Sequence, residues 1–184
     1  MQESIVFSGK IGAVVHTVQD DGRVFEQYRR SPGVRLIIVS PEGKILITKE
    51  KRQETNSVDL RLPGGKVCDS LAAYMALGAS GQDMMLAAKE AAIQEAREET
   101  GLAIKNPQFV TKAIDGATVE WDLYYFLVRE YEVLASGQDL GVGEEISVAW
   151  LTIDELKLAI SQGQMQEWRS VGVLLGCVMP TFFS

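Results

Sequence analysis

The sequence lacks a long apolar segment, a disulfide framework and an excess of positive charge. No run approaches the roughly 18 uninterrupted apolar residues of a membrane span, and residues 1–4 lack the basic start of a signal peptide, so we expect a cytoplasmic protein that does not bind membranes. Its two cysteines, Cys68 and Cys177, are too few and too far apart for a disulfide framework or a zinc site, and we expect free thiols. A net charge of −7 argues against a nonspecific nucleic-acid binder, which needs a basic face.

The composition favours one compact domain over residues 1–184. With 46% hydrophobic and 23% charged residues, the chain can build a full core, and we find no linker, low-complexity tract or internal repeat. The only histidine, His16, is interpreted as structural, because nothing pairs it with a nucleophile. The aromatic residues at 121 and 124–126 are interpreted as core rather than as a platform for a base.

Local patterns predict strands that are interrupted by a helix in mid-chain and followed by C-terminal helices. Apolar, aromatic and β-branched residues predict strands at 11–18, 24–30, 34–40, 44–50, 108–114, 119–134 and 146–151. Helices are expected at 85–100, from a Thr152-x-x-Glu155 capping box to about residue 162, and at 166–178. This order of elements predicts an α/β sandwich.

The acidic end of the expected helix at 85–100 is the most informative feature. Gly101 would close this helix in a left-handed conformation, which leaves Glu95, Glu98 and Glu99 on one face of its last two turns. Like charges at these spacings repel by roughly 0.2–0.5 kcal/mol per pair. A bound cation would make the arrangement of the three carboxylates favourable. Because oxygen ligands without nearby His or Cys favour Mg²⁺ or Mn²⁺, the pattern indicates a metal site. The alternative is a solvated acidic helix end.

These glutamates lie within a longer motif that resembles the signature of the Nudix hydrolases. That signature runs Gly, five residues, Glu, seven residues, Arg-Glu-apolar-x-Glu-Glu-x-Gly-apolar. Its second half matches Gln-Glu-Ala-Arg-Glu-Glu-Thr-Gly-Leu at 94–102, and Gly65 would be its opening glycine. The resemblance implies an α/β/α sandwich with a mixed central β-sheet. It also implies that Glu95, Glu98 and Glu99, with the carbonyl of Gly65, ligate divalent cations in an enzyme that cleaves a nucleoside diphosphate linked to another group.

The motif departs from the family pattern in two residues and in length. Gln94 replaces the motif arginine and Leu86 replaces its first glutamate, which the resemblance assigns mainly to holding the loop and helix in place. Between Gly65 and Gln94 lie 28 residues instead of 13, which indicates about 15 inserted residues within 67–83. We expect a short added helix there, capped by Asp69, that is either a lid shaping specificity or a surface decoration.

Two further segments resemble the ADP-ribose and ADP-sugar pyrophosphatase branch of that family. They are Lys-Glu-Lys-Arg at 49–52 and Gly-Glu-Glu-Ile-Ser-Val-Ala-Trp-Leu at 143–151. In that branch an Arg at the place of Arg52 touches the diphosphate. A glutamate of the late loop helps to position or activate the attacking water, and Glu144 and Glu145 are the candidates for this role.

The resemblance implies a metal-assisted hydrolysis of a diphosphate. Cations held by the motif, with Glu98 and Glu99 as catalytic residues, would neutralise phosphate oxygens and lower the pKa of a bound water. Arg52, with Lys66 and Arg61 as further candidates, would hold the diphosphate. The branch usually has Pro-Ala-Gly where this chain has Pro-Gly-Gly before Lys66, and Arg61 stands where an acidic residue is common.

The expected substrate is ADP-ribose or an ADP-sugar, which would give AMP and a sugar phosphate, and the resemblance suggests a homodimer paired through the N-terminal strands. Three alternatives stay open. The enzyme could act on nucleoside triphosphates, dinucleoside polyphosphates or coenzyme A, or the chain could be a nucleotide-sensing module that has lost turnover, as Leu86 and Gln94 suggest. The third is isopentenyl diphosphate isomerase, which needs a catalytic Cys in a context different from that of Cys68.

Overall fold

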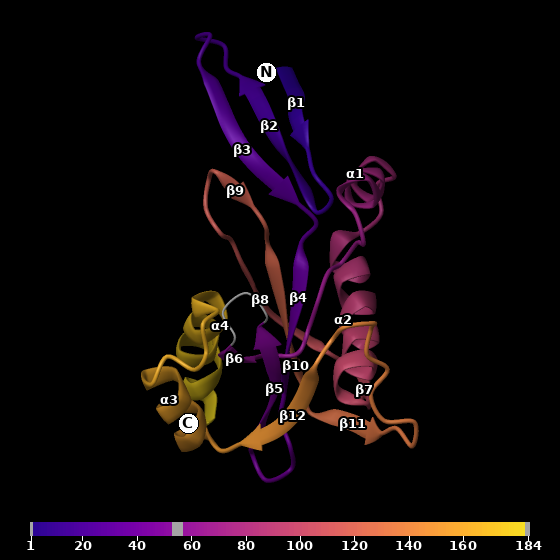
Figure 1. Ribbon diagram of the computed structural model, residues 1–184, viewed down its shortest axis with the longest axis vertical. Coiled ribbons are helices and arrows are strands. Elements are labelled where there is room, and N and C mark those ends of the chain that lie inside the picture. The colour runs from indigo at the N-terminus through magenta and orange to yellow at the C-terminus, as the bar shows by residue number, and fades with distance from the viewer. Residues whose placement is uncertain (1, 53–56, 183–184) are drawn as a thin grey trace.

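A central group of strands with helices on both sides forms the body of the molecule, and a second sheet projects from one end (Figure 1). The computed structural model describes residues 2–52 and 57–182, with the backbone alone for residues 52, 181 and 182. The strands are β1 (Gln2–Ser8), β2 (Gly12–Val18), β3 (Val24–Arg30), β4 (Gly33–Ile38), β5 (Ile45–Arg52), β6 (Ser57–Arg61), β7 (Leu102–Lys105), β8 (Gln108–Ala113), β9 (Val119–Glu120), β10 (Leu123–Val128), β11 (Glu130–Val133) and β12 (Ile146–Leu151). The helices are α1 (Leu71–Ala79), α2 (Met84–Thr100), α3 (Ile153–Ser161), α4 (Trp168–Val173), the π-helical η1 (Leu174–Val178) and the 3₁₀-helical η2 (Met179–Phe182).

The central strands run in both directions. β10 lies parallel to β4 and antiparallel to β8, while β5 lies antiparallel to both β12 and β6. An isolated bridge between Val39 and Ile45 connects β4 with β5 through the tight turn between them. The predicted α/β fold with mixed strand directions is therefore confirmed. In the described part of the chain, no helix is long and apolar enough to cross a membrane.

One face of the central strands carries α2. Four-residue spacing places three small side chains of α2 in a row against alternate residues of β4, and all six are buried: Ala88, Ala92, Ala96, Val34, Leu36 and Ile38. Alanine side chains let the helix axis approach the strands closely, which brings the acidic end of α2 against them. The opposite face is covered by α3, α4 and η1, through contacts among Leu156, Ile160, Val171, Leu174, Ile37, Ile45, Ile47 and Tyr125.

The projecting sheet contains β1, β2, β3 and the short β9. All of β1 is exposed, including Ile5 and the 63% exposed Phe7. Arg29 Nε in β3 donates to Glu120 Oε2 in β9 at 2.7 Å, and the hydroxyl of Tyr74 donates to Glu120 Oε1 at 3.1 Å. The helix α1, which the inserted residues form, is thus fastened to the projecting sheet.

Several local predictions hold. The helix α2 is confirmed, and it ends at Gly101 with φ of 69° in the left-handed region. The capping box of Thr152 and Glu155 opens α3 as predicted. The prediction of Asp69 as the cap of the inserted helix is wrong, because Ser70 caps α1 and accepts from the N–H of Ala73. Both residue types cap helices well, so the sequence does not decide between adjacent candidates.

Other elements differ from their predictions because their partners lie in different sheets. The segment predicted as one strand at 119–134 is divided into β9, β10 and β11, which join three separate sheets. Composition favours extended backbone in all three pieces but carries no signal for a change of partner. The helix predicted at 166–178 departs from α geometry at η1, in a region where Gly172 and Gly176 weaken a regular α-helix. Strands β1, β6 and β7 were not predicted.

A loop of Pro-Gly-Gly runs beside β4 under tight steric limits. The carbonyl of Pro63 accepts from Leu36 N at 2.8 Å, and that of Gly65 accepts from Val34 N at 2.9 Å. Gly64 has φ of 142°, and a Cβ on it would lie 2.2 Å from the carbonyl oxygen of Val34. The alanine that the related branch usually has in this loop therefore does not fit at position 64 without moving the strand or the loop.

We expect Gly64→Ala to lower the free energy of unfolding by roughly 2–4 kcal/mol, because it combines backbone strain with a clash. Gly43→Ala is the matched control: Gly43 has φ of 78°, but a Cβ there meets nothing within 4 Å, so only strain of about 1 kcal/mol is expected. Urea denaturation measures both values. Equal losses in the two variants would contradict the close approach of the loop to β4.

Candidate active site

The end of α2 presents two motif glutamates directly to the Pro-Gly-Gly loop. Glu99 Oε2 accepts the backbone N–H of Gly64 at 2.8 Å. A Cβ on Gly65 would lie 1.9 Å from Glu95 Oε1, so the absence of a side chain at Gly65 is what lets Glu95 lie against the loop. The helix that the sequence predicts and the loop that it places far upstream thus meet at these carboxylates.

Burial makes these carboxylates unusually hard to ionise. The pKa of Glu95 is raised to about 7 by burial and by the nearby charge of Glu98. Burial also raises the pKa of Glu99 to about 7, against the opposing effect of the Gly64 N–H, and Glu95 adds to the rise. The protein thus stabilises the ionised forms of these two carboxyl groups poorly, and a bound cation would favour ionisation.

The two departures from the motif have separate structural outcomes. Gln94 Nε2 donates to Glu98 Oε1 at 2.9 Å, so the residue that replaces the motif arginine still contacts a motif carboxylate. Leu86 lies in the first turn of α2 and is 56% exposed. Neither substitution disturbs the contacts of Glu95 and Glu99 with the loop.

The inserted helix forms one wall of a cavity beside the glutamates. This cavity has a volume of about 430 Å³, and Glu95, Glu98 and Lys66 line it together with Ala73 and Leu77 of α1. The inserted helix therefore borders the same cavity as Glu95 and Glu98.

The two late-loop glutamates occupy different environments. The charge of Glu144 contributes to the raised pKa of Glu95, and its carboxylate accepts from Gly141 N at 2.9 Å. Glu145 instead lies 3.6 Å from the ammonium nitrogen of Lys51. Of the two candidates, Glu144 is the one within electrostatic reach of the motif.

The same loop is attached to the end of α2 by hydrogen bonds. The N–H of Asp139 donates to the carbonyl of Glu98 at 2.9 Å, and the side-chain amide of Gln138 donates to the carbonyl of Glu99. These bonds use carbonyls that a helix end leaves without intrahelical partners. They hold the loop that carries Glu144 next to the end of α2 that carries the motif glutamates.

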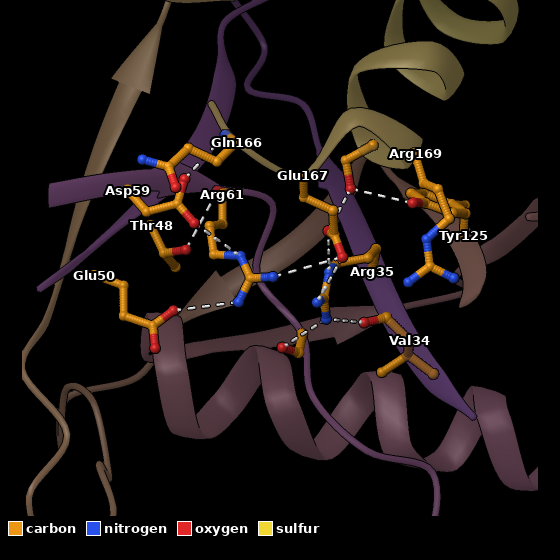
Figure 2. Close-up of polar contacts among 12 residues, drawn as sticks. Val34, Arg35, Thr48, Glu50, Asp59, Arg61, Tyr125, Gln166, Glu167 and Arg169 are labelled. Atoms are coloured by element: carbon orange, nitrogen blue, oxygen red, sulfur yellow. Dashed lines mark hydrogen bonds and ion pairs between the residues drawn. The ribbon is translucent and has the colours of Figure 1, made fainter. Parts of the chain in front are cut away.

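Figure 2 shows a buried ion pair between Arg35 and Glu167, which sequence reasoning missed and which contacts the glycine loop through Arg35. Arg35 donates to Glu167 through Nε at 2.7 Å and Nη2 at 3.2 Å, and both side chains are less than a tenth exposed. Arg35 Nη1 also donates to the carbonyl of Gly64 at 3.0 Å. Burial would raise the pKa of Glu167, but Arg35 and Arg61 outweigh it and lower the pKa to about 2. The sequence signal for this ion pair is Arg35 itself, a single basic residue in the otherwise apolar segment 34–39.

The predicted diphosphate-binding residues are placed unequally. The guanidinium of Arg61 lies within 3.5 Å of three carboxylates, those of Glu50, Asp59 and Glu167. Lys66 is exposed beside the glycine loop. Arg52 ends β5, and its side chain lies outside the described residues.

The donor set fits a hard divalent cation in its chemistry. Glu95, Glu98, Glu99 and the carbonyl of Gly65 offer only oxygen atoms, and two of the carboxylates are buried close to one another. Within residues 2–52 and 57–182, no three His, Cys, Asp or Glu side chains are already gathered tightly enough to form a metal site. Binding would therefore require these side chains to move closer together.

An α/β/α sandwich that sets glutamates of one helix against a glycine loop is the arrangement that the signature predicts for a pyrophosphohydrolase. A family model for the NUDIX domain matches residues 29–169. The chain therefore belongs to the Nudix family, and the prediction of a Nudix pyrophosphohydrolase is confirmed. Nudix hydrolases generally use divalent metal ions.

Similarity to solved structures supports the fold. A crystal structure of an ADP compounds hydrolase superposes with a TM-score of 0.69 and 16% sequence identity, covering 100% of this chain and 92% of that one. At this identity the match shows a shared fold. A search among curated proteins finds no match.

The raised pKa values predict how stability changes with pH in the absence of metal. Glu95 and Glu99 have folded-state pKa values of about 7, above the ordinary 4.5, so the folded state holds its protons more tightly than the unfolded state. The free energy of unfolding should therefore fall as pH rises from about 4.5 to about 7, and level off above. Urea titrations in EDTA measure this fall.

In the Glu99→Gln variant the side chain at position 99 cannot ionise. The fall in the free energy of unfolding with pH should therefore be smaller in this variant than in the wild type. Glu167 affects the free energy of unfolding in a different pH range. Its pKa is lowered to about 2, so the stability that it contributes is lost only as pH falls below about 4.5. A wild-type stability that rises between pH 5 and 7 would show that the two carboxylates are not protonated in the folded state.

Proposed function

We propose that the protein is a Mg²⁺-dependent hydrolase that cleaves the diphosphate of ADP-ribose or an ADP-sugar, releasing AMP and a sugar phosphate. The observation that carries the proposal is the placement of Glu95 and Glu99 against the Gly64–Gly65 backbone, with Glu98 beside them and a cavity open in front. The resemblance of residues 49–52 and 143–151 to the ADP-ribose and ADP-sugar branch supports the choice of substrate.

In this proposal each residue has a defined role. Glu95, Glu98 and Glu99 and the Gly65 carbonyl hold the cations, which, when bound, supply positive charge to the phosphate oxygens and lower the pKa of water. Glu144 orients the attacking water, a role supported by the hydrogen bonds of Gln138 and Asp139, which attach its loop to the end of α2. Glu145, paired with Lys51, is the weaker candidate.

Binding of the diphosphate falls to basic side chains near the loop. Lys66 lies exposed at the rim of the cavity that Glu95 lines, which suits a direct contact with phosphate. Arg61 contacts three carboxylates, so its contribution is to hold the surrounding framework and only secondarily to bind substrate. Arg52 remains a candidate by resemblance.

We expect Glu98→Gln to lower kcat by on the order of a hundredfold or more at saturating Mg²⁺, because the change removes a charge that would contact the cation. Glu130→Gln, which alters an exposed glutamate of β11 by the same charge, should leave kcat unchanged. Mass spectrometry of the products after incubation with ADP-ribose measures the activity. Normal turnover in Glu98→Gln would remove the assignment of the motif.

Parallel reactions with ATP, a dinucleoside polyphosphate and coenzyme A separate the alternatives. Product from only one of these would keep the chemistry and change the substrate. Binding of ADP-ribose with Mg²⁺ but no product from any compound would favour the nucleotide-sensing module. Full activity of Cys68→Ser would dismiss the isomerase, which depends on a catalytic cysteine.

We also propose a homodimer that pairs through the projecting sheet. β1 is exposed throughout and carries Ile5 and Phe7 on the surface, an edge that soluble monomers usually protect. Light scattering should give about twice the chain mass of 20.2 kDa at micromolar concentration, and Phe7→Glu should return the protein to the monomer mass. Val133→Glu, at an equally apolar but separate exposed position, should stay dimeric. A wild-type mass of one chain would refute the dimer.

A further inference from the structure

The inserted helix α1 is attached to the rest of the protein by few side chains. Of its nine residues only Leu71 is buried, and the large side chain of Met75 is 46% exposed. An isolated helix of this length is not stable in water. The position of α1 therefore depends on the small number of contacts that attach it to its neighbours.

Tyr74 attaches α1 to the projecting sheet through a chain of hydrogen bonds. Its hydroxyl donates to Glu120 Oε1 at 3.1 Å, while Glu120 Oε2 accepts from Arg29 Nε at 2.7 Å. Arg29 also donates through Nη1 and Nη2 to both carboxylate oxygens of Glu3 in β1. Burial and the charge of Glu120 raise the pKa of Tyr74 to about 12, so its hydroxyl stays protonated and acts as a donor at neutral pH.

The cavity beside the motif glutamates has α1 on one side and α2 on the other. Ala73 and Leu77, one helical turn apart, line it from α1, and α2 lines it with residues at helical spacing: Ala87, Glu90, Ala91, Gln94, Glu95 and Glu98. At a rise of about 1.5 Å per residue, Ala87 lies roughly 12 Å along α2 from Glu95. The cavity therefore extends well beyond the motif, far enough to hold a group that is linked to a diphosphate bound there.

The part of the cavity away from the motif has a lining that suits a sugar. It combines small apolar side chains with the exposed carboxylates of Asp69 and Glu90, neither of which forms a hydrogen bond or an ion pair within residues 2–52 and 57–182. Carboxylates accept hydrogen bonds from hydroxyl groups, and they repel anions. Among the described lining residues there is no aromatic ring on which a base would stack. This lining favours an uncharged group rich in hydroxyls over a base or a further phosphate.

We propose that α1 is a specificity element that closes this cavity around the uncharged sugar of the substrate, and that Tyr74 is the positioning residue that keeps α1 in place. The word substrate here rests on the proposed function. Ala73 and Leu77 contact the sugar, while Tyr74 acts only through its hydrogen bond to Glu120. Because α1 lies away from the cleaved bond, it affects binding of the substrate more than the chemical step.

The test is a pair of identical substitutions at adjacent positions. Ala72 and Ala73 are both exposed on α1, but Ala73 lines the cavity and Ala72 does not. Ala73→Leu fills the space and should raise the Kd for ADP-ribose by on the order of tenfold, while the Kd for ADP, which lacks the terminal sugar, stays within about twofold. Ala72→Leu should leave both Kd values within about twofold of the wild type. Calorimetry in EDTA measures them without turnover, because the proposed hydrolysis needs Mg²⁺.

Tyr74→Phe removes the hydroxyl alone and tests the positioning role. It should raise the Kd for ADP-ribose about threefold to tenfold, because α1 then occupies its closed position for a smaller fraction of the time. In the ligand-free protein, amide hydrogen exchange should become faster in α1 and stay unchanged in α2. Tyr131→Phe, in β11, removes a hydroxyl that makes no hydrogen bond within the described residues and should change neither quantity. A change in the Kd without a change in exchange, or the reverse, would overturn the positioning role.

These measurements separate the role of α1 from the proposed function. If the wild type hydrolyses no diphosphate but binds ADP-ribose, and Ala73→Leu alone weakens this binding, the role of α1 stands and the function does not. If the wild type hydrolyses ADP-ribose while Ala73→Leu and Ala72→Leu bind it equally well, the function stands and the role of α1 falls. An equal loss of affinity for ADP and ADP-ribose in Ala73→Leu would also overturn that role. In the supported case, Ala73→Leu and Tyr74→Phe should raise KM for ADP-ribose more than they lower kcat.

Discussion

The peptide unit of Gly64 is the point on which the site depends. Its carbonyl accepts from Arg35, which is itself bound to the buried Glu167, and its N–H donates to the carboxylate of Glu99. One residue therefore links the buried ion pair of the body to the motif glutamates of α2. Neither charge of the Arg35–Glu167 pair can be left unpaired at low cost, so Arg35 stays in place. Its hydrogen bond to the carbonyl of Gly64 then holds the loop in position.

The same constraint explains why glycine occupies both positions of the loop. Gly64 adopts a positive φ and passes so close to β4 that a side chain would meet the strand, and Gly65 leaves room for the Glu95 carboxylate. The row of alanines on α2 also allows close packing, because it lets the helix approach β4. Small residues on the loop and on the helix thus bring buried carboxylates and backbone oxygen together.

Acidic and basic side chains lie on different sides of this loop. On the α2 side, burial raises the pKa values of Glu95 and Glu99, so their ionised forms are stabilised poorly by the protein. On the other side, Arg30 and Lys66 carry positive charge without carboxylate partners in the part of the chain that the structure describes. A bound cation would compensate the glutamates and a diphosphate would compensate the basic side chains, which is the physical basis of the proposed function.

The sequence by itself determined the parts of this protein that depend on local pattern. The helix α2 and its glycine end, the capping box of α3, the strand β12 and the motif glutamates all follow from spacing and propensity, because those signals act within a few residues. The family was recognised by the resemblance of residues 94–102 to its signature, although Leu86 and Gln94 depart from that signature.

Only the tertiary structure decided which distant residues meet. Nothing local indicates that residues 119–134 divide among three sheets, that Arg35 pairs with Glu167 across 132 positions, or that the inserted helix is tied to Glu120. The unpartnered Arg30 is invisible in the sequence, where it stands beside the fully paired Arg29. A residue's charge is written in the sequence, but whether that charge is compensated depends on which chain segments pack around it.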